Sequence, residues 1–172
     1  HHAFGQLGYQ NKNGWNHPGG RKAVFVGNVV GTRGGNLSVI RTISDMIDQR
    51  RAVYLAGPAD RSLFRACQNS GLPKADDRIR EITGGIPKEH QEDFEQRFMA
   101  LYRKALPYVI LDSGRLVAAY AGIERRMIGR LSARIIDHCV NGPSGQRKVH
   151  SRSGKGPLIV SSLDQEIGRA HV

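Results

Sequence analysis

Three short apolar runs, each ending in a glycine turn, constrain what this chain can fold into. They occupy residues 23–34, 53–60 and 115–122. Residues 23–27 and 52–56 have the β-branched and aromatic composition of strands, and the first is expected to be buried on both faces. Between them, apolar residues recur at helical spacing and predict a helix from an N-cap at Asn36 to about Gln49. This strand–helix–strand order predicts an α/β fold with a mainly parallel sheet.

The rest of the chain continues the alternation of helices and strands. A helix is expected over about 60–68, a loop over 70–87 and a helix over about 88–104. Residues 108–111 and 115–119 flank Asp112-Ser113-Gly114 and predict a hairpin. Residues 129–140 favour a short strand or helix, 141–157 a loop and 158–160 a last strand. With 172 residues, the expected organisation is a single domain over 1–163.

The charge of the chain is strongly basic. Lysine and arginine number 26 against 15 acidic residues, which gives a net charge of +11. Such a field attracts nucleic acid or another polyanion and opposes the binding of free divalent cations. The basic residues are spread along the chain in pairs, so a solvated basic surface is the alternative to a dedicated polyanion site. Nucleic acid or another polyanion is therefore the candidate partner.

Cysteine usage and hydropathy indicate a cytoplasmic protein without a membrane segment. Cys67 and Cys139 lie far apart and neither is part of a CxxC motif, so a zinc site is not supported. Two free, buried thiols suit a reducing compartment. No apolar run approaches the ~20 residues that cross a bilayer. The sequence does not predict the oligomeric state.

Several segments together resemble the calcineurin-like metallophosphoesterases, and most of all the phosphatase module of bacterial polynucleotide kinase-phosphatases. The resemblance covers residues 4–142 and rests on HPGGRK at 17–22, AVFVG at 23–27, NLSVIR at 36–41, YVILDSGRLV at 108–117, AGI at 121–123 and GRLSAR at 129–134. It implies an αββα sandwich and a phosphoric-ester hydrolase. Such enzymes hold two divalent metals, such as manganese, which activate a water and clamp the phosphate.

The positions at which that family keeps its metal ligands carry other residues here. The family motif GDxxDRG corresponds to GNVVGTRG at 27–34, the GNH motif to GPA at 57–59, and the AHAG segment to AYAG at 119–122. The resemblance thus places Asn28, Gly31, Pro58 and Tyr120 at metal-ligand positions and Thr32 and Ala59 at catalytic positions. Hard divalent cations prefer several charged oxygens or imidazoles. No metal cofactor is therefore expected, and the chain is predicted to be an inactive pseudoenzyme of the phosphatase family.

The family's first DxH motif has no counterpart in the chain, and its late GHT motif has none with a histidine. The fold is accordingly expected to be truncated at the N-terminus and at the C-terminus. Residues 166–172 resemble the translation of a common sequencing-library adapter, so the tail over 164–172 is expected not to be native. A non-functional gene fragment is one alternative interpretation of the chain.

A second alternative is a basic module that binds a polyanion without metals. Arg33, Arg130 and Arg134 are the candidate phosphate-binding residues, because guanidinium groups bind phosphate directly. Asp60 is retained beside the GPA turn, and we expect it to act as a helix cap or first-turn acid.

Overall fold

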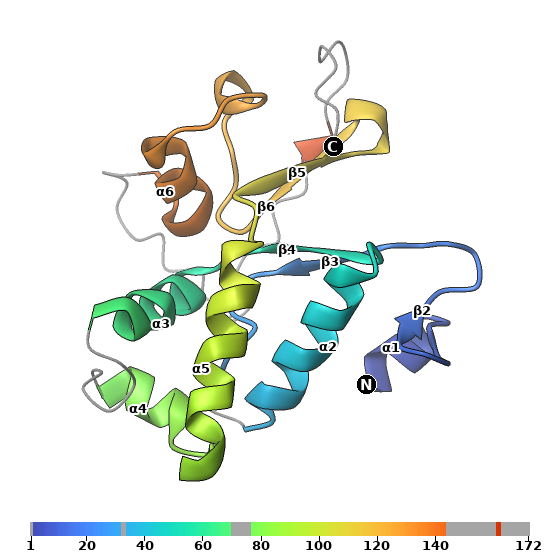
Figure 1. The fold of residues 1–172 in the computed structure, drawn as a ribbon. Helices are drawn as coiled ribbons and strands as arrows, with labels where there is room; N and C mark the ends of the chain where they lie inside the picture. Colours follow the sequence, from blue (N-terminus) through green and yellow to red (C-terminus); the bar gives the residue numbers. More distant parts are fainter. Residues whose placement is uncertain (1, 32–33, 70–76, 144–160, 163–172) are drawn as a thin grey trace, which may run out of the picture. The chain divides into compact units, whose positions relative to one another are not determined.

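The protein divides into two compact units, His1–Ala105 and Leu106–Val172. The structure, a computed structural model, describes residues 2–31, 34–69, 77–143 and 161–162. Its mixture of helices and strands agrees with the predicted α/β class (Figure 1).

The first unit is built on a strand–helix–strand motif. Strands β3 (Ala23–Val26) and β4 (Ala52–Leu55) pair in parallel, with Ala23 opposite Ala52 and Val26 opposite Leu55. Helix α2 (Asn36–Asp48) connects them. The predicted parallel pairing is therefore confirmed. The remaining short elements of this unit are α1 (His2–Gln6), β1 (Gln10–Asn11) and β2 (Trp15–Asn16), and β1 pairs with β2 in antiparallel fashion.

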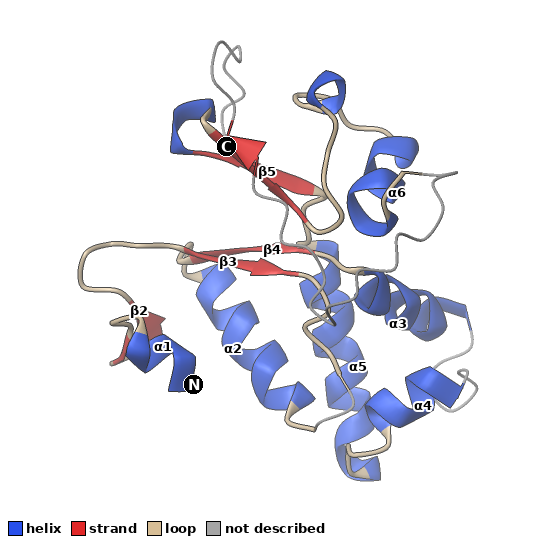
Figure 2. Cartoon of the chain, turned by 180° about the vertical axis from the view of Figure 1, so that it is seen from behind, coloured by secondary structure: helices blue, strands red, loops and turns tan. Residues whose placement is uncertain are grey.

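Helices cover one face of β3 and β4 and form the main core. They are α2, α3 (Pro58–Asn69) and α5 (Lys88–Arg103), and Figure 2 shows them on the same side of the two strands. Helix α4 (Asp77–Thr83) contacts α3. The core side chains that are completely excluded from solvent include Ile40, Leu55, Leu63, Phe94 and Phe98. Phe94, Phe98 and Leu101 recur at helical spacing, and this stripe places α5 against the core.

Three details of the first unit differ from the sequence expectations. Residues 70–87 were expected to be a loop, but α4 forms within them, because Ile79 and Ile82 supply a buried apolar face. The N-cap of α2 is Gly35, whose left-handed backbone (φ 73°) suits glycine, and Asn36 is the first helical residue. Strand β3 is half-buried throughout instead of buried on both faces.

The second unit contains the predicted hairpin and one helix. Strands β5 (Tyr108–Leu111) and β6 (Leu116–Ala119) are antiparallel and are joined by the 3-10 turn η2 (Asp112–Gly114). A second 3-10 turn, η3 (Arg125–Met127), precedes helix α6 (Ala133–Asn141). Residues 129–140 are thus helical in their second half. Strand β7 (Ser161–Ser162) pairs with β6, whereas the strand expected at 158–160 and the tail over 164–172 lie outside the described residues.

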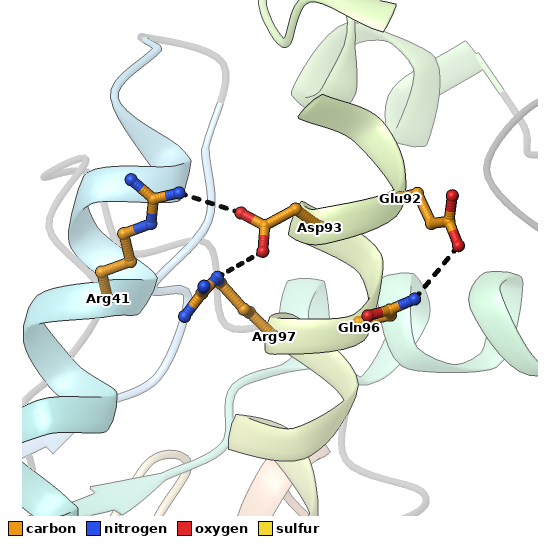
Figure 3. A network of polar contacts seen from close by, with 5 residues as sticks. All are labelled: Arg41, Glu92, Asp93, Gln96 and Arg97. Atoms are coloured by element: carbon orange, nitrogen blue, oxygen red, sulfur yellow. Dashed lines mark hydrogen bonds and ion pairs between the residues drawn. The ribbon is translucent and has the colours of Figure 1, made fainter. Parts of the chain in front are cut away.

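Helices α2 and α5 are also joined at their surface by an ion-pair network. The Asp93 carboxylate on α5 accepts from Arg41 of α2 at 2.9 Å and from Arg97 of α5 at 2.6 Å (Figure 3). A second pair on α5, Gln96 and Glu92, is hydrogen-bonded at 3.1 Å. The two guanidinium groups, Arg97 foremost, lower the pKa of Asp93 below its ordinary value of 3.8.

We expect the variant Asp93→Asn to lower the melting temperature slightly at pH 7 and to have no effect well below pH 3.8. A carboxylate with a depressed pKa stabilises the folded state above its unfolded-state pKa, and this contribution disappears as the pH falls through its folded-state pKa. Added salt should shrink the difference at pH 7. The control is Asp45→Asn on α2, an exposed acid for which the structure gives no ion pair in its described part. Equal changes in melting temperature for the two variants at pH 7 would contradict a stabilising role of the ion-pair network.

Candidate functional site

Two loops follow the carboxyl ends of β3 and β4. Because the strands are parallel, both loops emerge at the same edge of the sheet, where ligands of α/β proteins bind. The first loop begins with Gly27 and Asn28, both in the left-handed region (φ 57° and 49°). The second consists of Ala56 and Gly57 and leads directly into α3. The first loop carries Asn28 and Gly31, and Pro58 begins α3 directly after the second, so three of the four positions that the resemblance assigned to metal ligands lie at this edge.

Asp60 joins the two loops through backbone amides. Its side chain is fully buried, and its Oδ1 accepts from the N–H of Val29 at 2.9 Å. Its Oδ2 accepts from the N–H of Gly57 at 3.0 Å. Gly57 directly precedes α3 and Asp60 lies in the first turn, so the second bond corresponds to one half of a capping box, in which a first-turn side chain accepts the N–H of the residue before the helix. The expected first-turn acid is confirmed, and its carboxylate additionally ties down the loop after β3.

Asn28 makes the reciprocal connection. Its Oδ1 accepts from the N–H of Ala59 at 3.1 Å, in the first turn of α3. The backbones of the two loops approach so closely that a Cβ atom at Gly57 would lie 2.6 Å from Asn28 Oδ1 and 2.7 Å from its backbone nitrogen. Only glycine fits this contact without displacement of the loop.

A third clamp, which the sequence did not indicate, is made by Asn36. Its buried side chain accepts from the N–H of Gly31 at 3.0 Å and donates to the Gly31 carbonyl at 2.8 Å. It also donates to the carbonyl of Ile82 at 2.9 Å, which lies in α4. The amide of Asn36 therefore fixes the far end of the β3 loop to α4. An asparagine after two glycines predicts a helix cap, and no local pattern distinguishes that role from this one.

Burial raises the pKa of the Asp60 carboxyl, and the hydrogen bonds from Gly57 and from the β3 loop oppose part of that shift. The buried hydroxyl of Tyr54 is a polar neighbour of Asp60. The pKa of Tyr54 is raised, mainly by burial and further by the negative charge of Asp60. The Tyr54 hydroxyl is close enough to Asp60 for each group to shift the pKa of the other. Its oxygen nevertheless has no partner in hydrogen-bonding geometry among the described residues.

The donor atoms at this edge do not fit a two-metal centre. Both oxygens of Asp60 and the side-chain oxygen of Asn28 already accept backbone hydrogen bonds, while Gly31, Pro58 and Ala59 offer no side-chain donor. Within the described ranges, no group of three or more histidine, cysteine, aspartate or glutamate side chains is placed to hold a metal ion. Thr32 and Arg33 lie outside the described residues. The arrangement is suited to holding two loops together through side-chain oxygens and backbone N–H groups.

The other predicted site residues belong to the second unit. Tyr120 is half-buried in the bend that follows β6, and the next residue, Ala121, donates its N–H to the carbonyl of Cys139 at 2.8 Å. Arg130 and Arg134 line one pocket together with Arg126. The structure therefore brings two of the three predicted phosphate-binding arginines together, and Arg126 is a neighbour that the sequence reasoning missed.

In the described part of the chain, no helix is long and apolar enough to traverse a lipid bilayer. No protein-family model matches the chain.

The chain is similar to bacterial proteins named bis(5'-nucleosyl)-tetraphosphatase PrpE (asymmetrical). The protein of this name from Geobacillus thermodenitrificans is 31% identical over 122 residues, which are 69% of this chain and 49% of that protein. The one from Anoxybacillus flavithermus is 32% identical over 130 residues, with 69% and 49% of the two chains covered. The one from Bacillus subtilis is 30% identical over 144 residues, with 80% and 57% covered.

The chain thus spans about half the length of the curated relatives it matches. The relatives are named as phosphatases, which supports the phosphatase interpretation of the framework. Their name gives no support to a particular link with polynucleotide kinase-phosphatases.

We expect Gly57→Ala to lower the free energy of unfolding by about 1–3 kcal/mol, because the new methyl group overlaps Asn28 and must push the two loops apart. Denaturant-induced unfolding followed by circular dichroism measures the change. The control is Gly85→Ala, where a Cβ would meet nothing within 4 Å and the backbone φ is not positive. An equal decrease in the free energy of unfolding for both variants would contradict the close approach of the two loops.

The variant Asp60→Asn is expected to cost about 1–3 kcal/mol, because both oxygens of a carboxyl can accept an N–H in either protonation state, whereas the amide nitrogen of Asn cannot accept the N–H of Val29 or Gly57. The pKa of Asp60 is raised, so its stabilising contribution is fully present below the ordinary value of 3.8 and is lost as the pH rises through the folded-state pKa. The cost of the substitution should therefore be larger in acid than at pH 8, measured by denaturant unfolding. Asp77→Asn, at the exposed first turn of α4, is the control.

Proposed function

We propose that this chain is a metallophosphoesterase-type domain, related to phosphatases of bis(5'-nucleosyl) tetraphosphates, that does not hydrolyse phosphate esters by the two-metal mechanism. The observation that carries the proposal is the set of side chains at this edge, where Gly31, Pro58 and Ala59 offer no metal ligand. The side-chain oxygens of Asn28 and Asp60 accept the N–H groups of Ala59, Val29 and Gly57 and so hold the two loops together. In a two-metal phosphatase, the corresponding edge presents free carboxylate and imidazole ligands to the cations.

The parallel β3–α2–β4 motif and the resemblance over 4–142 support the αββα architecture as part of this proposal. The similarity to named phosphatases at about half their length supports a phosphatase ancestry. A closer kinship with polynucleotide kinase-phosphatases stays a hypothesis. The two free cysteines are consistent with the cytoplasmic location that we propose.

The chemistry of the replaced ligands gives the reason for inactivity. A bridging carboxylate compensates charge from two cations at once, whereas the amide of Asn28 is neutral and its oxygen already accepts the N–H of Ala59. Loss of that bond would leave the Asp60 contact to Val29 as the link between the first turn of α3 and the β3 loop. The net charge of +11 adds an unfavourable field for a divalent cation.

A second candidate function is the binding of a polyanion, including nucleic acid. The observation that favours it is the pocket in the second unit that Arg126, Arg130 and Arg134 share. It needs no metal, because guanidinium groups contact phosphate oxygens directly.

Calorimetric titration of the full chain with Mn²⁺ tests the main proposal. We expect no binding in the micromolar range and no phosphate release from a bis(5'-nucleosyl) tetraphosphate in the presence of Mn²⁺. The relative from Bacillus subtilis, treated identically, is the positive control for the assay. Micromolar Mn²⁺ binding by this chain, or turnover above the uncatalysed rate, would overturn the proposal. Circular dichroism establishes that the titrated protein is folded.

A further inference from the structure

In the second unit, a small pocket opens between the turn η3 and the first turn of α6. Its volume is about 220 Å³, and it is lined by Arg126, Met127, Arg130, Ser132, Arg134 and Ile135. Three of these six residues are arginines and none is acidic. Drug-sized ligands occupy pockets of about 300–1,000 Å³, so this one suits a smaller group.

Buried neighbours hold two of the arginines in place. Met127 and Ile135 are 8% and 9% exposed, and both pack in one apolar cluster with Ala119 and Cys139. Arg126 and Arg134 each lie beside one of these anchors in the sequence. The backbone from which the two guanidinium groups extend is therefore fixed by the core of the unit, and only the side chains need to be ordered by a ligand.

The third arginine is fixed by its own backbone. The N–H of Arg130 donates to the carbonyl of Met127 at 3.1 Å, and its carbonyl accepts from the hydroxyl of Tyr108 in β5 at 3.0 Å. Gly129, with φ 77°, permits the turn that brings Arg130 back over Met127. The loop is thus held on both sides of the arginine.

The positive charge of the pocket is only partly balanced. Arg126 forms an ion pair with Glu124 at 2.6 Å, and this bond lowers the pKa of the Glu124 carboxyl. For Arg130 and Arg134 the described part of the structure gives no ion pair. Both side chains are exposed, so two guanidinium groups remain available to an anion.

The first turn of α6 adds backbone donors to the arginines. Ser132 caps the helix by accepting from the N–H of Ile135 at 3.3 Å. The N–H groups of Ala133 and Arg134 have no acceptor among the residues that the structure describes. The partial positive charge of a helix N-terminus favours an anion at this end.

We propose that this pocket binds a phosphate group, either inorganic phosphate or a phosphate monoester, without a metal. Arg130 and Arg134 contact the phosphate oxygens, Arg126 contributes charge, and the amides of the first turn of α6 complete the site. Guanidinium groups form paired hydrogen bonds to phosphate that a dispersed basic surface does not provide. The proposal is independent of the inactivity proposed above, since no residue of the β3 and β4 loops lines the pocket.

Calorimetric titration of the full chain with inorganic phosphate, in a low-salt chloride buffer, tests this site. The double variant Arg130→Gln/Arg134→Gln should weaken binding by at least about tenfold, because charge-assisted hydrogen bonds are lost. The matched control, Arg21→Gln/Arg65→Gln, removes the same charge from two exposed arginines outside the pocket and should leave binding within about twofold. The variant Arg130→Lys/Arg134→Lys keeps the charge, loses the paired geometry and should fall between wild type and the glutamine variant.

The proposed site would be wrong if the wild-type protein did not bind phosphate. An equal loss of phosphate affinity in the pocket variant and the control variant would also contradict it, and would indicate attraction by the overall basic surface instead. If the glutamine variant does not fold by circular dichroism, the lysine variant decides, and wild-type affinity in it counts against the site.

Oligonucleotides with and without a 5'-phosphate identify the source of the phosphate. Tighter binding of the 5'-phosphorylated strand would indicate that the ligand is the phosphorylated end of a nucleic-acid strand. Equal affinity for that strand and for a nucleoside monophosphate would indicate that the ligand is a nucleotide. Equal binding of both strands, without competition by inorganic phosphate, contradicts the proposal.

Discussion

The buried carboxylate of Asp60 holds together the loops that follow β3 and β4. Its two oxygens accept one N–H from each loop, and Asn28 returns a bond from the first loop to the first turn of α3. These contacts set the distance between the two strand ends, which is why Gly57 has no room for a Cβ atom. The start of α3 and the β3 loop therefore both depend on Asp60, which lies three residues after Gly57.

This arrangement occupies the edge at which α/β proteins bind their ligands. A two-metal centre there requires several oxygen or imidazole ligands, whereas Gly31, Pro58 and Ala59 offer no side-chain ligand and backbone hydrogen bonds fix the oxygens of Asn28 and Asp60. A movement of one of these oxygens that broke its hydrogen bond would leave the N–H unsatisfied in a region where Asp60 is fully buried, at a cost of about 1–3 kcal/mol per group. Metal binding that displaced these oxygens would therefore reduce the stability of the loops.

Much of the architecture follows from local patterns, and the site does not. Apolar periodicity predicted the β3–α2–β4 motif, α5 and the hairpin, because each of these elements carries a complete pattern within its own length. Helix α4 was missed because it has seven residues and lies in a segment bounded by glycine and proline. The contact between Asp60 and Val29 joins residues 31 positions apart, and no local spacing encodes such a pair. Asp60 was recognisable as a first-turn acid, but not as a bridge between two loops.

The arginines of the second unit likewise were only partly predictable from the sequence. Arg130 and Arg134 are four residues apart and were grouped from the sequence, whereas Arg126 joins them only because η3 and the Gly129 turn fold back toward α6. In the second unit, then, the groups that could meet a phosphate ester are arginines and backbone amides instead of metal-binding carboxylates. A chain with a net charge of +11 is better matched to an anion held directly than to one held through two divalent cations, since the same field that repels the cations attracts the phosphate. The proposed absence of a two-metal centre and the proposed binding of phosphate are therefore physically compatible in one protein.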